Sequence, residues 1–238
     1  MNTDKQSAFR RRTTLRIRAS SFWSTDRSLT ILLVLLVGNI FTAPLSEFAT
    51  WGRFAARSIL SLIIISGVIA TVRDRRIVAL VIALAFGSLL LGWEGVEQSN
   101  RYLDLFNDLY SLIFLGFLII LILRQVLRAG PITTRRVQGS VAVYLLLGIL
   151  WAVCYEIVEL LQPGSFVVFG RKGTAALPQL AYFSFTTLTT LGLGEIVPLS
   201  PLARSFVVLE ALVGQLFPVV LIARLVAMQI EYQTDRAR

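Results

Sequence analysis

The chain has 238 residues, of which 55% are hydrophobic and 16% charged, and its mean hydropathy is +0.73. This composition excludes an ordinary soluble domain and indicates a polytopic membrane protein, because the apolar residues occur in blocks of membrane-spanning length. The formal net charge is +9, and the sequence contains no His and a single Cys, Cys154. Histidine-ligated metal sites, histidine acid–base catalysis and an intrachain disulfide are therefore excluded, and we do not expect an enzyme.

Residues 1–27 form a basic N-terminal arm. An excess of Arg and Lys is typical of nucleic-acid binding or of contact with anionic lipid. We favour the membrane interpretation, because basic residues before a first span set the orientation of a membrane protein and no aromatic interleaving supports nucleic-acid binding. The predicted partner of the arm is membrane lipid, with no nucleic acid.

Six apolar stretches follow, each long enough to cross the hydrocarbon core of a bilayer. The predicted spans cover residues 28–44, 54–72, 77–93, 103–123, 140–161 and 203–230. Most of the 23 Lys and Arg residues lie in segments on the same side as the N-terminus, so both termini are predicted to be cytoplasmic. The predicted fold class is an all-α, multi-pass protein of the cell (plasma) membrane.

The first four spans are interpreted as a peripheral four-helix domain, residues 28–128. A voltage-sensing helix carries several basic residues along its length, because the electrical work scales with the charge moved through the field. Residues 103–123 of the fourth span contain no Lys or Arg. We therefore expect weak or absent voltage sensing. Residues 137–230 form a second predicted domain, and residues 231–238 form a short cytoplasmic tail.

The segment between the fifth and sixth spans is too polar and too rich in Gly, Pro and Thr to cross the membrane once. Pro178 suits the first turn of a helix, and residues 179–189 are long enough for about three turns. The helix leads into residues 189–195, after which Pro198 and Pro201 return the chain to the outer surface. Non-helical backbone at membrane depth must be buried in protein or line a water-filled path, so we predict a re-entrant segment.

Glycine alternates with larger residues in this segment, at Gly192 and Gly194. Because glycine accepts positive φ angles, successive carbonyls of such a strip can point the same way. Several chains around one axis would then stack rings of carbonyl oxygens that replace the hydration shell of a cation, with the Thr190 hydroxyl adding a further ring. Glu195 places a carboxylate at the outer mouth.

Residues Thr187 to Glu195 read Thr-Leu-Thr-Thr-Leu-Gly-Leu-Gly-Glu and resemble the potassium channel signature Thr-x-Thr-Thr-Val-Gly-Tyr-Gly-Asp. With both flanking spans, residues 140–230 are similar to the two-helix pore modules of bacterial ion channels. The resemblance implies a homotetramer with K+ as its permeant ion and no cofactor. It also implies a selectivity filter in which K+ is bound along Thr190, Leu191, Gly192, Leu193 and Gly194.

Three residues depart from the signature: Leu191 stands for Val, Leu193 for Tyr and Glu195 for Asp. The change at Leu193 removes a hydroxyl that normally braces the filter from behind, although Leu also occurs there in two-pore-domain potassium channels. Tyr182 and Thr186 lie one turn apart on the predicted pore helix. They are candidates to brace the Glu195 carboxylate, and simple packing is an equal alternative.

The last span contains Gly214 and Pro218, and a proline inside a helix removes one hydrogen bond and bends the helix. We interpret the pair as a gating hinge, with close packing at the glycine and a static kink as the alternative. Glu210 lies inside the same span, where an ionisable group is costly enough to be a functional candidate. Its partner is not identifiable from the sequence.

These patterns predict a tetrameric, potassium-selective channel that is weakly or not voltage-gated and conducts passively through a carbonyl-lined filter. One alternative is a non-selective cation channel, which would arise if Leu191 and Leu193 loosen the filter. The other is a non-conducting membrane scaffold or sensor that retains the pore fold.

Overall fold

The computed structural model describes residues 29–39, 62–63, 101–128, 132–170 and 175–237. The basic arm and the predicted spans at residues 54–72 and 77–93 lie outside the described residues, apart from residues 62–63. The first predicted span is described as the helix Leu29–Asn39. The prediction of six spans therefore rests partly on residues outside the described part of the chain.

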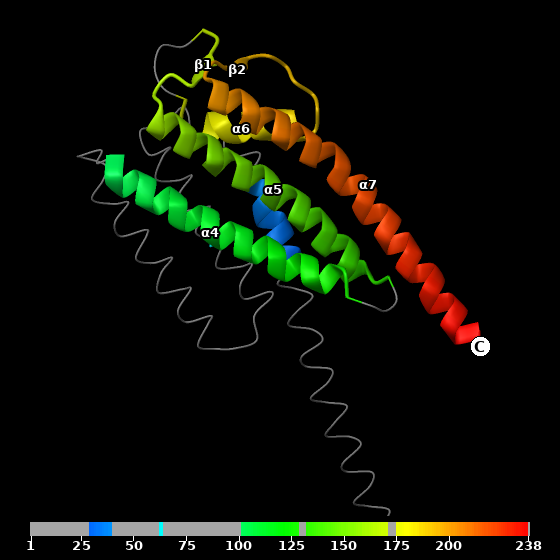
Figure 1. The fold of residues 1–238 in the computed structure, drawn as a ribbon. Coiled ribbons are helices and arrows are strands. Elements are labelled where there is room, and N and C mark those ends of the chain that lie inside the picture. Colours follow the sequence, from blue (N-terminus) through cyan, green and yellow to red (C-terminus); the bar gives the residue numbers. More distant parts are fainter. Residues whose placement is uncertain (1–28, 40–61, 64–100, 129–131, 171–174, 238) are drawn as a thin grey trace, which may run out of the picture.

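Three of the described helices are long and apolar enough to cross a membrane. They are α4 (Arg101–Val126), α5 (Thr134–Leu161) and α7 (Pro201–Ala237) (Figure 1). They coincide with the fourth, fifth and sixth predicted spans and continue past them at one or both ends. The extra turns carry polar residues, which an apolar window does not include but a helix accommodates where it leaves the hydrocarbon. The described residues are mostly helical and fit an all-α membrane protein.

Helices α4 and α5 run antiparallel and pack along their length. The Arg101 guanidinium at the start of α4 donates a hydrogen bond to the Leu161 carbonyl at the end of α5. Between these ends, Leu115 and Leu118 of α4 and Leu146 of α5 are fully buried in one apolar cluster. Because lipid is as apolar as these side chains, close van der Waals packing rather than escape from water holds the helices together.

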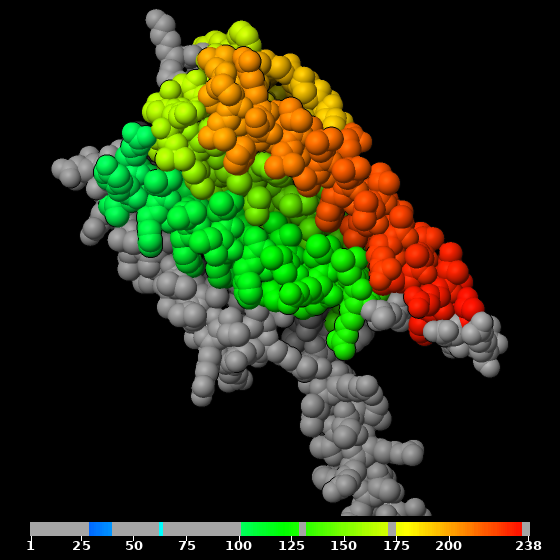
Figure 2. Space-filling model, viewed as in Figure 1, coloured from blue at the N-terminus to red at the C-terminus, as the bar shows by residue number. Residues whose placement is uncertain are grey.

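Helix α7 lies along one edge of the described chain, and its C-terminal end extends beyond the other elements (Figure 2). Most of its apolar surface is exposed in the single chain, whereas most of α5 is buried. A long apolar helix with so little cover inside its own chain is available for contact with lipid or with further chains.

A short helix, α6 (Leu177–Leu188), lies between α5 and α7 at one end of the molecule (Figure 1). Pro178 lies in its first turn, as predicted, and the Gln179 side-chain oxygen accepts a hydrogen bond of 3.1 Å from the Ala176 N–H. Gly148 of α5 faces the Phe185 ring so closely that a Cβ there would overlap the ring. The absence of a side chain at Gly148 thus lets α6 approach α5.

Two three-residue strands, which the all-α prediction did not include, flank α6 in the sequence. Strands β1 (Phe166–Val168) and β2 (Ile196–Pro198) pair antiparallel, with Val167 opposite Val197. The Glu159 carboxylate at the end of α5 accepts hydrogen bonds from the N–H groups of Gly164 and Phe166. The paired strands close the segment that contains α6 into a loop with fixed ends.

Candidate functional site

The strip, defined as residues 190–195, follows the last turn of α6 in the chain. Main-chain hydrogen bonds hold it against that turn. The Thr190 N–H donates to the Thr187 carbonyl at 2.9 Å. The Leu191 and Gly192 N–H groups both donate to the Thr186 carbonyl, at 2.8 and 3.1 Å. Three consecutive N–H groups of the strip are thus turned toward α6.

The sign of φ alternates along the strip. Thr190, Gly192 and Gly194 have φ angles of 58°, 54° and 79°, and no other residue of the strip has a positive φ. Alternating right- and left-handed residues bring successive N–H groups to one side of the backbone and leave the carbonyls on the other. Positive φ was predicted at the two glycines but not at Thr190, a β-branched residue that pays about 1–2 kcal/mol for it.

The carbonyls of residues 190–193 are available to a ligand. Within the part of the chain that the structure describes, none of them accepts a hydrogen bond. Leu191 and Leu193, which alternate with the left-handed residues, are 62% and 54% exposed in the single chain. A row of unpaired carbonyls is costly unless a polar group or a cation binds to it.

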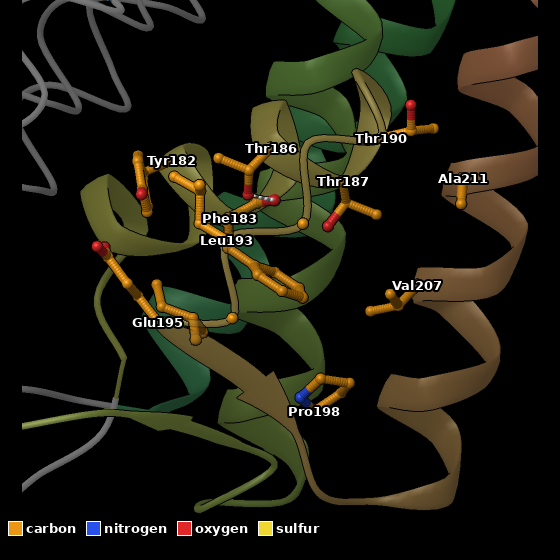
Figure 3. Close-up of a pocket in the computed structure, with 13 residues that line it drawn as sticks. Tyr182, Phe183, Thr186, Thr187, Thr190, Leu193, Glu195, Pro198, Val207 and Ala211 are labelled. Carbon is orange, nitrogen blue, oxygen red and sulfur yellow. Dashed lines mark hydrogen bonds between the residues drawn. The ribbon is translucent and has the colours of Figure 1, made fainter.

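The far end of the strip is held by β1 and by α6. The Glu195 carbonyl accepts a hydrogen bond of 2.9 Å from the Phe169 N–H, just after β1. The Glu195 carboxylate lies beside Tyr182 of α6 (Figure 3). Desolvation, together with this carboxylate, raises the pKa of the Tyr182 phenol, so the phenol keeps its proton.

Thr186 contacts the strip differently from the predicted bracing. Its hydroxyl donates to the Phe183 carbonyl at 2.9 Å, one turn back in α6 (Figure 3), and is not directed at Glu195. Its main-chain carbonyl is the group that receives the two strip N–H donors. The structure therefore brings both candidates to the strip, Tyr182 through its side chain and Thr186 through its backbone.

A cavity of about 290 Å³ lies between α6, the strip, β2 and α7. Its walls include Thr187 of α6, Leu193 of the strip, and Val207 and Ala211 of α7 (Figure 3). The strip is thus supported at both ends by its own chain, with room for a side chain between it and α7.

Part of the chain is similar to known channel proteins. Residues 141–231 match the Ion channel family. Over 71 residues the chain is 35% identical to the inward rectifier potassium channel Kirbac3.1 of Paramagnetospirillum magnetotacticum, and this alignment covers 30% of the chain and 20% of the relative. These two matches support membership of the potassium channel superfamily for this segment. The chain thus spans about a fifth of that relative's length, and no solved structure gives a significant match.

Within the segment that matches the ion channel family, the fully buried Glu210 of α7 has two partners that could not be identified from the sequence. Tyr155 of α5 donates a hydrogen bond to one carboxyl oxygen, and Ser184 of α6 is hydrogen-bonded to the other. The Ser184 hydroxyl also bonds the Gly148 carbonyl at 2.7 Å. A hydroxyl has one proton, so when Ser184 donates to Gly148, Glu210 supplies the proton of their shared bond as a neutral carboxylic acid.

Gly214 of α7 packs against the end of α6. A Cβ at residue 214 would overlap the Leu188 carbonyl oxygen, so the close approach of α7 to α6 requires glycine. The same carbonyl accepts a hydrogen bond of 3.1 Å from the Tyr144 hydroxyl of α5. Pro218 lies inside α7, which continues through it to Ala237. The contact at Gly214 supports the packing alternative for this residue, and the hinge stays a prediction.

We expect Glu210→Gln to retain most of the stability of the protein and Glu210→Ala to lose it. An amide reproduces the neutral acid, since its NH2 donates to Ser184 and its oxygen accepts from Tyr155. Alanine leaves a cavity and an unpaired Tyr155 hydroxyl, at a cost of about 2–4 kcal/mol. Thermal unfolding in detergent measures both. An equal loss in the two variants would show that Glu210 must be ionised.

We expect Gly214→Ala to lower the unfolding temperature, because the added methyl group meets main-chain atoms that cannot move aside. Gly116→Ala on α4 is the matched control, since a Cβ there makes only an ordinary contact with Leu150. Alanine is favoured over glycine in a helix by about 1 kcal/mol, so the control is expected to unfold at the same or a higher temperature. A similar rise in both variants would contradict the packing role of Gly214.

Proposed function

We propose that this protein is a homotetrameric potassium channel of the cell membrane whose selectivity filter is the strip. The observation that carries the proposal is the row of carbonyls at residues 190–193, which accept no hydrogen bond from the described residues and follow an alternating backbone. Four such rows around one axis form stacked rings of oxygen that replace the hydration shell of K+. K+ is the permeant ion and no cofactor takes part.

In this proposal α6 is the re-entrant pore helix. The carbonyls of Thr186 and Thr187 accept hydrogen bonds from the filter N–H groups and so hold the filter in place. The negative C-terminal end of the α6 dipole favours a cation in the water-filled space beneath. Glu195 stands at the outer mouth, where its carboxylate attracts cations, and Tyr182 lies beside it. Tyr182 and the Thr186 carbonyl then brace the filter in place of the hydroxyl that Leu193 lacks.

The exposed apolar surface supports assembly of several chains. Leu191 and Leu193 of the strip and Leu212 and Leu216 of α7 are exposed in the single chain. A fourfold arrangement covers such side chains against neighbouring chains, and the cavity beside the strip leaves room for an apolar group there. Membrane lipid covers the remaining apolar surface.

We further propose that both termini are cytoplasmic and that voltage has little influence on gating. Helix α4 carries Arg101 at its first residue and Arg124 in its last turn, with no basic residue between them. Charges at the two ends of a span cross little of the membrane field. If α7 bends to open the path, the proposed bend lies at Pro218, where the helix lacks one main-chain hydrogen bond.

Liposomes that contain the purified protein are expected to pass K+ in preference to Na+, and Gly192→Ala is expected to abolish this flux. A Cβ at residue 192 meets no atom within 4 Å, so the substitution acts through the left-handed backbone at φ 54° rather than through a clash. Concentrative uptake of radioactive rubidium, with competing K+ or Na+, measures both conduction and selectivity.

Gly116→Ala serves as the matched control and is expected to conduct like the wild-type protein. Equal flux of K+ and Na+ that still depends on Gly192 would replace the proposal with a non-selective cation channel. No flux from correctly folded protein in either cation would support the scaffold or sensor instead.

The purified protein is expected to have a mass of four times 26.5 kDa after subtraction of bound detergent. Each chain contributes one strip, so an assembly of fewer than four chains leaves each ring of carbonyls incomplete. A dehydrated cation needs ligands on all sides. Light scattering coupled to size-exclusion chromatography measures this mass. A monomer or dimer that still conducts K+ would contradict the fourfold filter.

A further inference from the structure

Gln215 joins α7 to the first residue of the strip. Its side-chain NH2 donates a hydrogen bond of 3.1 Å to the Thr190 hydroxyl, across 25 residues of sequence. The preceding residue, Gly214, packs against the Leu188 carbonyl at the end of α6. Two consecutive residues of α7 therefore meet the junction where α6 ends and the strip begins. This contact was not predictable from the sequence, because a single Gln on an apolar helix has no distinctive spacing.

The hydrogen bonds of Thr190 fix the direction of its hydroxyl. The hydroxyl donates its own proton to the Thr189 carbonyl at 2.7 Å and accepts the Gln215 proton on one lone pair. A hydroxyl oxygen has two lone pairs, so one stays available to a cation. Without Gln215 the hydroxyl keeps only its bond to the adjacent Thr189 carbonyl, and the cation meets a less ordered ligand.

The backbone of Thr190 also depends on outside contacts. Its φ of 58° is unfavourable for a β-branched residue, and a conformation of this kind persists only where its surroundings hold it. Thr190 makes three hydrogen bonds among the described residues: its N–H donates to Thr187 of α6, and its hydroxyl donates to the adjacent Thr189 carbonyl and accepts from Gln215 of α7. Gln215 is the contact that comes from outside the pore helix and the strip.

We propose that Gln215 is a positioning residue that sets the cation affinity of the first ring of the filter, by fixing the Thr190 hydroxyl. The ligand is a dehydrated cation of the size of K+, for which Ba2+ is a divalent probe of similar radius. This inference rests on the proposed function, since it assigns Thr190 to that ring. It adds a residue of α7 to a site otherwise built from α6 and the strip.

The test is calorimetric titration of K+ and of Ba2+ into the purified full-length protein in a buffer without other metal cations. Gln215→Leu keeps the size of the side chain and removes the donor, and it is expected to weaken Ba2+ binding about tenfold, the usual effect of one lost hydrogen bond. Gln229→Leu is the matched control on the same helix. Gln229 accepts a bond from the Ile132 N–H and lies about 21 Å further along α7, so its variant is expected to bind as the wild type does.

A double-mutant cycle with Thr190→Cys separates a direct effect from a general one. A thiol is a weak acceptor, so in this background Gln215→Leu is expected to change binding no further. The same tenfold loss in the Cys background, or no loss in the wild-type background, would overturn the role of Gln215. Gln215→Asn, whose shorter amide does not reach Thr190, carries the same expectation and replaces the Leu variant if that variant fails to assemble.

Binding and flux distinguish this inference from the proposed function. If the wild type binds Ba2+ through Gln215 but passes no ions in liposomes, the channel proposal fails and the role of Gln215 stands. If the wild type conducts K+ while Gln215→Leu binds Ba2+ unchanged, only the role of Gln215 fails. A wild-type protein that binds neither cation overturns both.

Discussion

The geometry of the strip depends on one acceptor, the main-chain carbonyl of Thr186. A helix end leaves carbonyls without partners in the helix, and here one of them receives the N–H groups of both Leu191 and Gly192. With these donors turned toward α6, the carbonyls of the strip face the opposite side. The left-handed residues allow this arrangement, and the strain at Thr190 is its local cost. The C-terminal end of α6 thus gains hydrogen-bond donors for its free carbonyls and at the same time sets the direction in which the strip carbonyls point.

The three helices around the strip meet at a small number of polar contacts inside an otherwise apolar core. Glu210 connects α7 to Tyr155 of α5 and Ser184 of α6, and Tyr144 of α5 bonds the last carbonyl of α6. In an apolar environment such hydrogen bonds have no competing water, and they specify one arrangement of the helices. Aromatic rings pack beside them, with the Tyr155 and Phe166 ring centroids 5.2 Å apart. These contacts determine how α5, α6 and α7 are placed relative to one another more than they add to the total stability.

The sequence was sufficient to predict the elements whose signal is local. Apolar length predicted α4, α5 and α7, Pro178 predicted the start of α6, and the glycine alternation predicted the left-handed residues at 192 and 194. Contacts between distant residues were not predictable, because one sequence contains no record of which side chains meet. The partners of Glu210, the donor Gln215 and the β1–β2 pairing are all of this kind. Thr186 is a further example. Its side chain suggested a contact through the hydroxyl, whereas its main-chain carbonyl accepts the hydrogen bonds from the strip.

The two parts of α7 on either side of Pro218 have different neighbours. The part before Pro218 is held against α6 by the contact at Gly214, while the 19 residues after it pack through Leu221, Leu225 and Met228 against the apolar core of α4 and α5, and its last turns extend past these helices. At 1.5 Å per residue this second part is a rod of about 28 Å. A change of only 10° at its base displaces its far end by about 5 Å, by simple leverage over that length. A small rearrangement at one turn of α7 is therefore magnified at the C-terminal end of the helix, while the strip itself stays in place.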